Sequence, residues 1–298
     1  MEQAITEIEK LHIRQANKFI ERIQPQWSAI TQRFFLYCIA KVNKNNEHFE
    51  PLDIHMNELP QILGYSDKSK LVGTEVKTIF SELNAESNVQ IIQDVGKGKR
   101  IFHSIFLFQE IYFNEKENRA RILFSEPMRD HVLQLKEKKL GFTDFKYAEV
   151  INIKGSYSTR LIELLHQYKK IGKREFIYSD LRRYLGVSDE KYKDYRDFKK
   201  WILEQAKKEI NKNPKSTIDV DFKGIKVGRF IGKIEFTIIA RRQPSEQEKQ
   251  DIKQQILLAE ETVAATVMAD EEINQLNPDD SIFLKIAQRN GVNILNKE

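Results

Sequence analysis

The sequence predicts an α+β fold with two successive modules of one design, each with three helices followed by a β-hairpin. The pattern Leu-x-x-x-Leu-Gly occurs at residues 59–64 and again at 181–186, each time near the end of a short helical segment. Arg100-Ile-Phe and Arg229-Phe-Ile each follow a turn that contains Gly and Lys. This repeated order predicts two tandem winged helix-turn-helix domains related by internal duplication, plus a C-terminal helical appendage.

The repeat also sets the expected domain boundaries. We expect an N-terminal winged-helix domain over residues 1–140, a connection over 141–155, a C-terminal winged-helix domain over 156–244 and an acidic helical tail over 245–298. A chain of 298 residues is long enough for two domains that each bury a core.

Periodicity and turn signals define the elements of the first half. Ser28 is placed to cap a helix that runs through Val42, and Gly64 ends a short helix, because Gly readily adopts the left-handed backbone that closes many helices. The other expected elements are a helix at about 4–22, a helix from Ser66 to about 84, strands at 89–94, 100–113 and 119–124, and a helix at 128–139.

The predicted strand at 100–113 is unusually apolar, with more large side chains than one face of a small domain needs. Two interpretations are open. The strand forms a subunit or inter-domain interface, or it is buried on both faces.

The second half repeats the first. Ser158 opens a helix, a short helix follows at 180–185 and ends at Gly186, and strands at 217–222 and 229–239 are joined by a turn that contains Gly224 and Gly228. Between them, residues 188–211 scan as one amphipathic helix. Its apolar stripe holds Tyr195, Phe198, Ile202, Ala206 and Ile210, and its basic stripe holds Lys193, Arg196, Lys200 and Lys207.

A basic amphipathic helix is often only a solvated surface helix. Here it stands after a short Gly-terminated helix and before a hairpin with Lys and Arg, which is the place of the recognition helix in a winged helix. The charge supports this interpretation. Residues 151–244 carry a net charge of +11, residues 1–150 a net charge of 0 and residues 245–298 a net charge of −6. The basic segment indicates a polyanionic partner, most simply nucleic acid.

The candidate DNA-binding residues follow from this placement. Arg196 is the best candidate for reading a base, because a guanidinium can bond O6 and N7 of guanine together. Lysines such as Lys199 and Lys207 are expected at phosphates, and Ser158 and Arg160 lie at a helix start, which favours a phosphate. The full set is Lys193, Arg196, Lys199, Lys200, Lys207, Ser158, Arg160, Lys223, Lys226 and Arg229 in the second module, and Lys68, Lys70, Lys97, Lys99 and Arg100 in the first.

Several other classes of protein are disfavoured. No apolar run is long enough for a membrane span, and the first residues lack the pattern of a secretory signal. The single cysteine, Cys38, lies in an apolar run, which predicts a buried thiol in a cytoplasmic protein. The six histidines include no His-x-His pair, and residues 96–100 do not match a P-loop, so we expect no cofactor, no nucleotide hydrolysis and no metal-dependent nicking.

Specific motifs carry a resemblance to a known family. The chain resembles the plasmid replication initiators that bind iterons, over roughly residues 13–240. The resembling segments are Tyr157–Tyr168, Leu181–Val187, Tyr192–Asn211, Gly228-Arg229 and Gln15–Ala40. The acidic tail is not part of the resemblance, and it is a partner contact, a self-shielding segment or a solvated appendage.

The resemblance implies a protein that binds directly repeated origin sites on double-stranded DNA as a monomer. It also implies a dimer, paired through the first module, that represses its own promoter at an operator, and it implies the host initiator and the replicative helicase as partners. Two alternatives stay open: a winged-helix transcription regulator with no initiator role, and an enzyme that nicks DNA with a tyrosine such as Tyr192 or Tyr195.

Overall fold

The computed structural model describes residues 7–22, 26–65, 73–94, 100–139 and 141–241. The chain up to Arg241 forms one compact unit with a continuous apolar core. The predicted helical tail, the cap at Ser66 and the turn at 96–99 lie outside the described residues.

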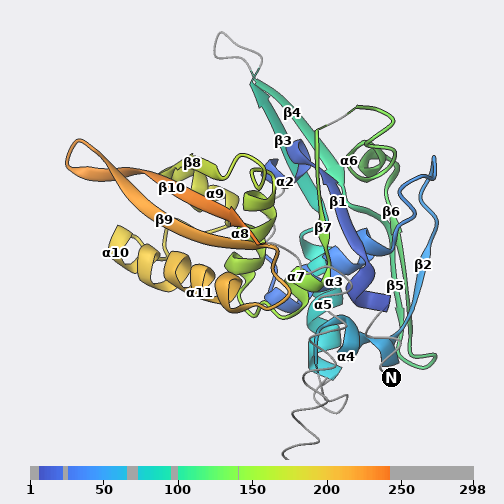
Figure 1. Ribbon diagram of the computed structural model, residues 1–298. Helices are drawn as coiled ribbons and strands as arrows, with labels where there is room; N and C mark the ends of the chain where they lie inside the picture. Colours follow the sequence, from blue (N-terminus) through green and yellow to red (C-terminus); the bar gives the residue numbers. More distant parts are fainter. Residues whose placement is uncertain (1–6, 23–25, 66–72, 95–99, 140, 242–298) are drawn as a thin grey trace, which may run out of the picture. The chain divides into compact units, whose positions relative to one another are not determined.

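The first module contains the three predicted helices and the predicted hairpin (Figure 1). Its first helix begins after Ser28, whose hydroxyl accepts a hydrogen bond from the backbone N–H of Thr31, as the predicted cap requires. The buried Cys38 lies on the same helix, and burial raises the pKa of its thiol. These elements are α3 (Ala29–Lys41), α4 (Leu59–Ile62), α5 (Gly73–Ala85), β3 (Asn88–Asp94) and β4 (Arg100–Phe106).

Two further sheets complete this module. One is the antiparallel pair β1–β7 and the other has the strand order β2-β6-β5. The strands are β1 (His12–Ala16), β2 (Leu52–His55), β5 (Phe108–Asn114), β6 (Arg119–Phe124) and β7 (Phe142–Lys146). The short helical segments are α2 (Asn17–Arg22), η1 (Met56–Glu58), η3 (Glu126–Met128), α6 (Arg129–Val132) and α7 (Ala148–Ile151).

The second module has three strands in the order β8-β10-β9, all antiparallel. Its long hairpin projects past the N-terminal end of the neighbouring helix (Figure 1). The elements are α8 (Ser156–His166), β8 (Lys173–Ile177), α9 (Tyr178–Tyr184), α10 (Tyr195–Phe198), η4 (Lys199–Leu203), α11 (Glu204–Lys212), β9 (Ile218–Val227) and β10 (Phe230–Ala240).

The two Leu-x-x-x-Leu-Gly segments end their helices in the same way. Gly64 has φ +78° and Gly186 has φ +67°. In both copies the residue after the glycine donates its N–H to the carbonyl five residues back, at 2.8 and 2.9 Å, and the glycine donates to the carbonyl three residues back. This is the Schellman closure, which needs a left-handed residue where only Gly is unstrained. The predicted α+β fold with two winged-helix modules is confirmed.

Three predictions for the first half were wrong. Residues 12–16, placed in a helix, form strand β1, because they pair with residues 142–146 from the distant end of the module. The strand predicted at 100–113 is two strands, β4 and β5, which pair with β3 and β6 in different sheets. The helix predicted at 128–139 is a single turn, α6, since the chain leaves it at Leu133 in an extended conformation.

Two features of the second half also differ from the prediction. The helix predicted at 188–211 begins only after Asp194, so Lys193 precedes it. Strand β8 was not predicted, although its alternating burial is typical of an edge strand with one face on a core.

Helix α8 joins the two modules, since it packs against α3 of the first and α11 of the second. Its Glu163 accepts a hydrogen bond from Gln15 at 3.2 Å, and Arg174 Nη2 lies 2.7 Å from the Glu21 carboxylate. The segment 141–155 contains β7 and α7, and β7 pairs with the N-terminal strand of the first module.

Candidate DNA interface

The recognition helix runs from Tyr195 through Lys212 as three consecutive segments, α10, η4 and α11. Four residues of its predicted apolar stripe are at most 1% exposed: Phe198, Ile202, Ala206 and Ile210. The middle turn, η4, is a π-helical turn, which inserts one extra residue and brings Leu203 into the core beside Ile202. One face of the helix is therefore anchored, and the opposite face is presented to solvent.

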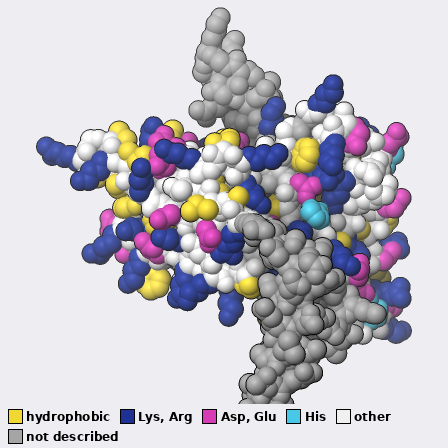
Figure 2. Space-filling view, in the orientation of Figure 1, with side chains coloured by type: hydrophobic (Ala, Val, Ile, Leu, Met, Phe, Trp, Pro, Cys, Tyr) yellow, Lys and Arg dark blue, Asp and Glu magenta, His cyan; other side chains and the backbone are white. Residues whose placement is uncertain are grey.

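The solvent face is basic (Figure 2). The Arg196 side chain is 87% exposed. Its nearest ion-pair partner among the described residues is the neighbouring Asp197, at the long distance of 3.8 Å, so the guanidinium is held only loosely. Lys193 and Lys199 each lie 3.7 Å from an exposed glutamate, and Lys200 Nζ lies 4.7 Å from the ring centre of Trp201. Exposed pairs at such distances contribute little stability, so these cations can exchange their partners for phosphates at little cost.

Lys207 forms an ion pair within the protein, and its phosphate contact stays a prediction. Its ammonium group lies 2.7 Å from Asp221 Oδ1 on β9, and this hydrogen bond raises the pKa of Lys207. The side chain therefore ties α11 to the hairpin, and it would have to leave Asp221 to reach a phosphate.

The wing is the β9–β10 hairpin, and its charges differ along its length. Lys223 Nζ lies 2.8 Å from Glu235, which also pairs with Lys173. Lys226 and Arg229, near the tip, are exposed and form no ion pair within the described part of the chain. The tip is therefore the most strongly unneutralised part of the wing.

The wing packs closely against the recognition helix at Gly224 and Tyr195. A Cβ atom added to Gly224 would lie 2.6 Å from Tyr195 Oη, so the glycine leaves room for the tyrosine at the start of α10. The Tyr195 ring also packs edge-on against Tyr178 of α9, with ring centres 5.8 Å apart. This joint fixes the distance between the two surfaces that carry the exposed cations.

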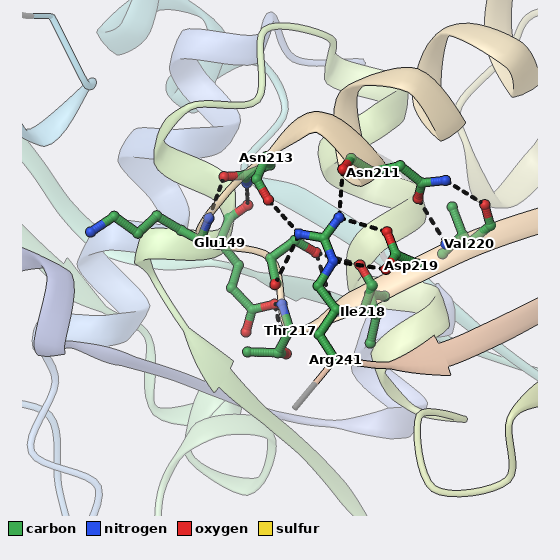
Figure 3. Close-up of polar contacts among 10 residues, drawn as sticks. Glu149, Asn211, Asn213, Thr217, Ile218, Asp219, Val220 and Arg241 are labelled. Atoms are coloured by element: carbon green, nitrogen blue, oxygen red, sulfur yellow. Dashed lines mark hydrogen bonds and ion pairs between the residues drawn. The ribbon is translucent and has the colours of Figure 1, made fainter. Parts of the chain in front are cut away.

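The other end of the recognition helix is held by a polar cluster (Figure 3). The Asn211 side chain forms two hydrogen bonds with the backbone of Val220 on β9, at 2.8 and 2.9 Å. Arg241, directly after β10, donates to the carbonyls of Asn211, Asn213 and Ser216. The last carbonyls of a helix lack partners within the helix, so these donors complete its C-terminus.

Glu149 of α7 belongs to the same polar cluster, since its backbone carbonyl accepts a hydrogen bond from the Asn213 side chain. It is 1% exposed, and its Oε2 accepts hydrogen bonds from the backbone N–H and the hydroxyl of Thr217, at 2.7 and 2.9 Å. His166 Nε2 lies 3.0 Å from the same oxygen. Burial acts to raise the pKa of Glu149, but the hydrogen bonds from His166 and Thr217 outweigh it and hold the pKa below its usual value.

Two predicted phosphate ligands lie in the interior and are corrected. Ser158 and Arg160 are each 3% exposed, and Arg160 is bound to the carbonyl of Ile20 and to Glu163. The N-terminus of α8 is occupied by a protein carboxylate, since Glu209 Oε2 accepts a hydrogen bond from the Gly155 N–H at 3.0 Å. The Glu209 carboxylate of the protein itself therefore occupies the helix N-terminus at which we expected a DNA phosphate.

The candidates of the first module are only partly described. Lys68, Lys70, Lys97 and Lys99 lie outside the described residues, and Arg100 is placed by its backbone at the start of β4. These positions stay predictions.

Three hydrophobic residues of the second module are exposed and were not among the predicted site residues. Trp201 is 56% exposed on the basic face of the helix, and Val227 and Phe230 are 58% and 80% exposed at the wing tip. The signal was present in the sequence, since Trp201 follows the basic pair Lys199-Lys200 and Phe230 follows Arg229.

Two kinds of feature are absent from the described residues. None of their helices combines the length and apolar character of a membrane span. Within the same residues, no three His, Cys, Asp or Glu side chains are grouped as metal ligands would be.

An anchored basic helix beside a basic hairpin, in a chain that repeats the module, defines the class of tandem winged-helix proteins that bind nucleic acid. The family model described as Initiator Replication protein, WH1, matches residues 12–166, and the model described as Initiator Rep protein, WH2, matches residues 178–238. The chain belongs to this family of initiator replication proteins. The first match extends from β1 through α8, and the domain bounds at 1–140, 141–155, 156–244 and 245–298 stay predictions.

A solved structure has the same fold. The crystal structure of the Pi initiator protein in complex with iteron DNA is similar with a TM-score of 0.63 and 19% sequence identity, covering 79% of this chain and 99% of that chain. No curated protein matches the chain.

Proposed function

We propose that this protein initiates plasmid replication by binding repeated sites, or iterons, in double-stranded origin DNA. The observation that carries the proposal is the exposed basic face of α10–η4, whose ion pairs are loose, beside the basic wing tip, in a chain of the initiator family. The similar Pi initiator is solved in complex with iteron DNA, which supports the same kind of ligand.

In this proposal the N-terminal half of the recognition helix enters the major groove. Arg196 is at the first exposed turn, where a guanidinium can bond the O6 and N7 atoms of guanine. Lys193, Lys199 and Lys200 flank it and contact phosphates or base edges. The tip cations Lys226 and Arg229 bind the sugar–phosphate backbone beyond the groove edge, and Lys223 does so more weakly because Glu235 competes for it.

We place self-association in the first module. Phe106 on β4 is 60% exposed and Tyr112 on β5 is 47% exposed, so large apolar side chains are available for a second copy of the chain. A dimer formed there would repress the protein's own promoter by binding an operator, and the monomer would bind iterons. The host initiator and the replicative helicase are the proposed protein partners, and the cytoplasm is the proposed place of action.

The protein acts by binding and distorting DNA in this proposal, without catalysis by its tyrosines. Tyr195 Oη is packed against the wing at Gly224, and burial raises the pKa of the phenol, which disfavours the phenolate nucleophile. Tyr192 packs edge-on against Tyr157, with ring centres 6.5 Å apart. These environments favour a packing role over the alternative of a nicking enzyme.

A gel-shift titration tests the proposal. Full-length protein should bind a duplex with the plasmid's repeats at least 10³-fold more tightly than a scrambled duplex, the lower end of specific discrimination, which is about 10³–10⁷. Equal affinity for both duplexes would contradict it. The transcription-regulator alternative predicts binding at a promoter with no binding at repeats. A covalent protein–DNA adduct on supercoiled origin DNA with Mg²⁺ would favour the nicking enzyme.

A further inference from the structure

The tip of the wing combines a strongly exposed aromatic side chain with unneutralised cations. Phe230 is 80% exposed, and its cross-strand partner Val227 is 58% exposed. Lys226 and Arg229 are each adjacent to one of them along the chain. A single exposed apolar residue is common on protein surfaces. Here two of them form a small apolar patch at the end of a hairpin, with a cation next to each.

The backbone of the tip is built to hold this shape. Gly228 turns the chain with φ +68°, a conformation that L side chains rarely adopt. The strand register shifts between Ile231 and Lys233, so Gly232 is a bulge, which increases the local twist. A Cβ atom at Gly232 would lie 2.6 Å from Val227 Cγ2, so the valine folds across the bulge and leaves Phe230 outermost.

The reach of the hairpin fits DNA geometry. The wing contacts the recognition helix where Tyr195 meets Gly224, and Val227 is three residues further out. Three residues of strand extend about 10 Å. The major groove is about 12 Å wide, so with α10 in the major groove the tip clears the neighbouring phosphate ridge and meets the adjacent minor groove.

We infer that Phe230, supported by Val227, is an apolar wedge that enters the minor groove of the bound DNA and partly unstacks one base step. Lys226 and Arg229 bind the phosphates on either side of the insertion. Wedges of this kind kink a duplex, and they act most readily at flexible pyrimidine–purine steps such as TA. Phe230 is thus a determinant of DNA distortion and of indirect sequence preference, whereas Arg196 reads bases directly. The inference rests on the proposed function, since it requires bound DNA.

Charge decides between DNA and protein as the occupant of this surface. The segment 151–244 carries a net charge of +11, and the two cations nearest the tip have no ion-pair partner among the described residues. A phosphate-lined groove complements that pattern, and the apolar area of two side chains is too small for a stable protein interface.

The experiment uses full-length protein and iteron duplexes with 2-aminopurine placed at successive steps beside the major-groove site. Wild type should raise the fluorescence at one step by about twofold or more, and end-labelled duplexes should show a bend by energy transfer, as an unstacking wedge requires. Phe230→Ala should abolish the fluorescence rise, reduce the bend and weaken binding by about 3- to 30-fold, while Phe230→Leu should retain most of each effect. Ile239→Ala is the matched control, since Ile239 is 58% exposed on the same strand away from the tip.

The outcomes are separable. If wild type binds iterons without unstacking any step, or if Phe230→Ala unstacks and bends DNA as wild type does, the wedge is overturned and the proposed function stands. If Phe230→Ala changes only self-association or capture of another protein, the tip is a protein-docking surface and the wedge is again overturned. If wild type does not bind iterons, the proposed function and the wedge fail together. Circular dichroism and a thermal melt of each variant exclude misfolding as the cause.

Discussion

Arg241 and Asp219 are joined by two hydrogen bonds, from Nε to Oδ2 at 2.9 Å and from Nη2 to Oδ1 at 2.6 Å. The pair links the end of β10 to the start of β9, while the same guanidinium binds the carbonyls that end α11 (Figure 3). Arg241 therefore helps to hold the recognition helix and the wing together at their base, beside the two hydrogen bonds of Asn211 with Val220.

Arg241→Ala should lower the free energy of unfolding by about 1–3 kcal/mol, since it leaves a carboxylate and several carbonyls without their donor. Arg241→Lys should recover only part of the loss, because an ammonium cannot form the two-bond pair. Urea denaturation measures both. Arg183→Ala is the control: its exposed pair with Asp180 is at a helix surface, so stability should change by less than about 1 kcal/mol. Equal losses for Arg241→Ala and Arg183→Ala would contradict the role of Arg241.

Arg196→Ala should relax base preference at one position of the site, at a cost of about 1–3 kcal/mol of binding free energy. The reason is that its guanidinium is 87% exposed on the helix face and can bond both acceptors of a guanine edge. Titrations of duplexes substituted at each position measure the change. If every substitution penalises the variant as much as wild type, the groove assignment of α10 is wrong.

Lys226→Ala should weaken binding to all sequences by a similar factor and lower the salt slope by about 1, as expected for one lost phosphate contact. Lys223→Ala should have a smaller effect on both, because Glu235 already neutralises this lysine. Binding isotherms over a range of KCl concentrations measure the slopes. A change confined to the specific site would show that Lys226 reads sequence.

Gly224→Ala should reduce specific binding and lower stability by about 1–3 kcal/mol, since the new methyl group would overpack the contact with Tyr195 Oη. Tyr195→Phe removes that oxygen, so the double variant should be less impaired than Gly224→Ala alone. A double-mutant cycle on binding and stability measures the coupling. Additive effects would mean that the joint does not set the position of the wing.

Glu149 gives a pH dependence with a defined sign. Its pKa is held below the usual value in the folded state, so it contributes stability above its unfolded pKa of about 4.3 and loses that contribution as the pH falls through the folded pKa. Glu149→Gln should therefore be less stable than wild type at pH 7, and the difference should shrink below about pH 4. Denaturant titrations at several pH values test this. A difference that is constant with pH would exclude the carboxylate charge as its cause.

Local signals in the chain were sufficient for much of the fold. The cap at Ser28, the helix ends at Gly64 and Gly186 and the buried stripe of the recognition helix were predicted correctly, because each depends on a few neighbouring residues. Strand β1 and the division of residues 100–113 could not be predicted in this way, since both are decided by pairing with strands distant in the chain.

The same distinction applies to the interface. Residue type and helical spacing placed Arg196 and Lys200 on one stripe, and both residues are exposed in the structure. Spacing could not show that Lys207 pairs with Asp221, or that Glu209 fills the N-terminus of α8, because these partners come from other elements.

The sequence by itself determined the two-module order, the basic character of the second module and the position of its recognition helix, since composition and period are local properties. Only the tertiary structure decided which charges are free to bind DNA. Packing buries Arg160, pairs Lys207 and leaves Phe230 exposed at the wing tip, and burial and neutralisation by distant residues are properties of the folded chain alone.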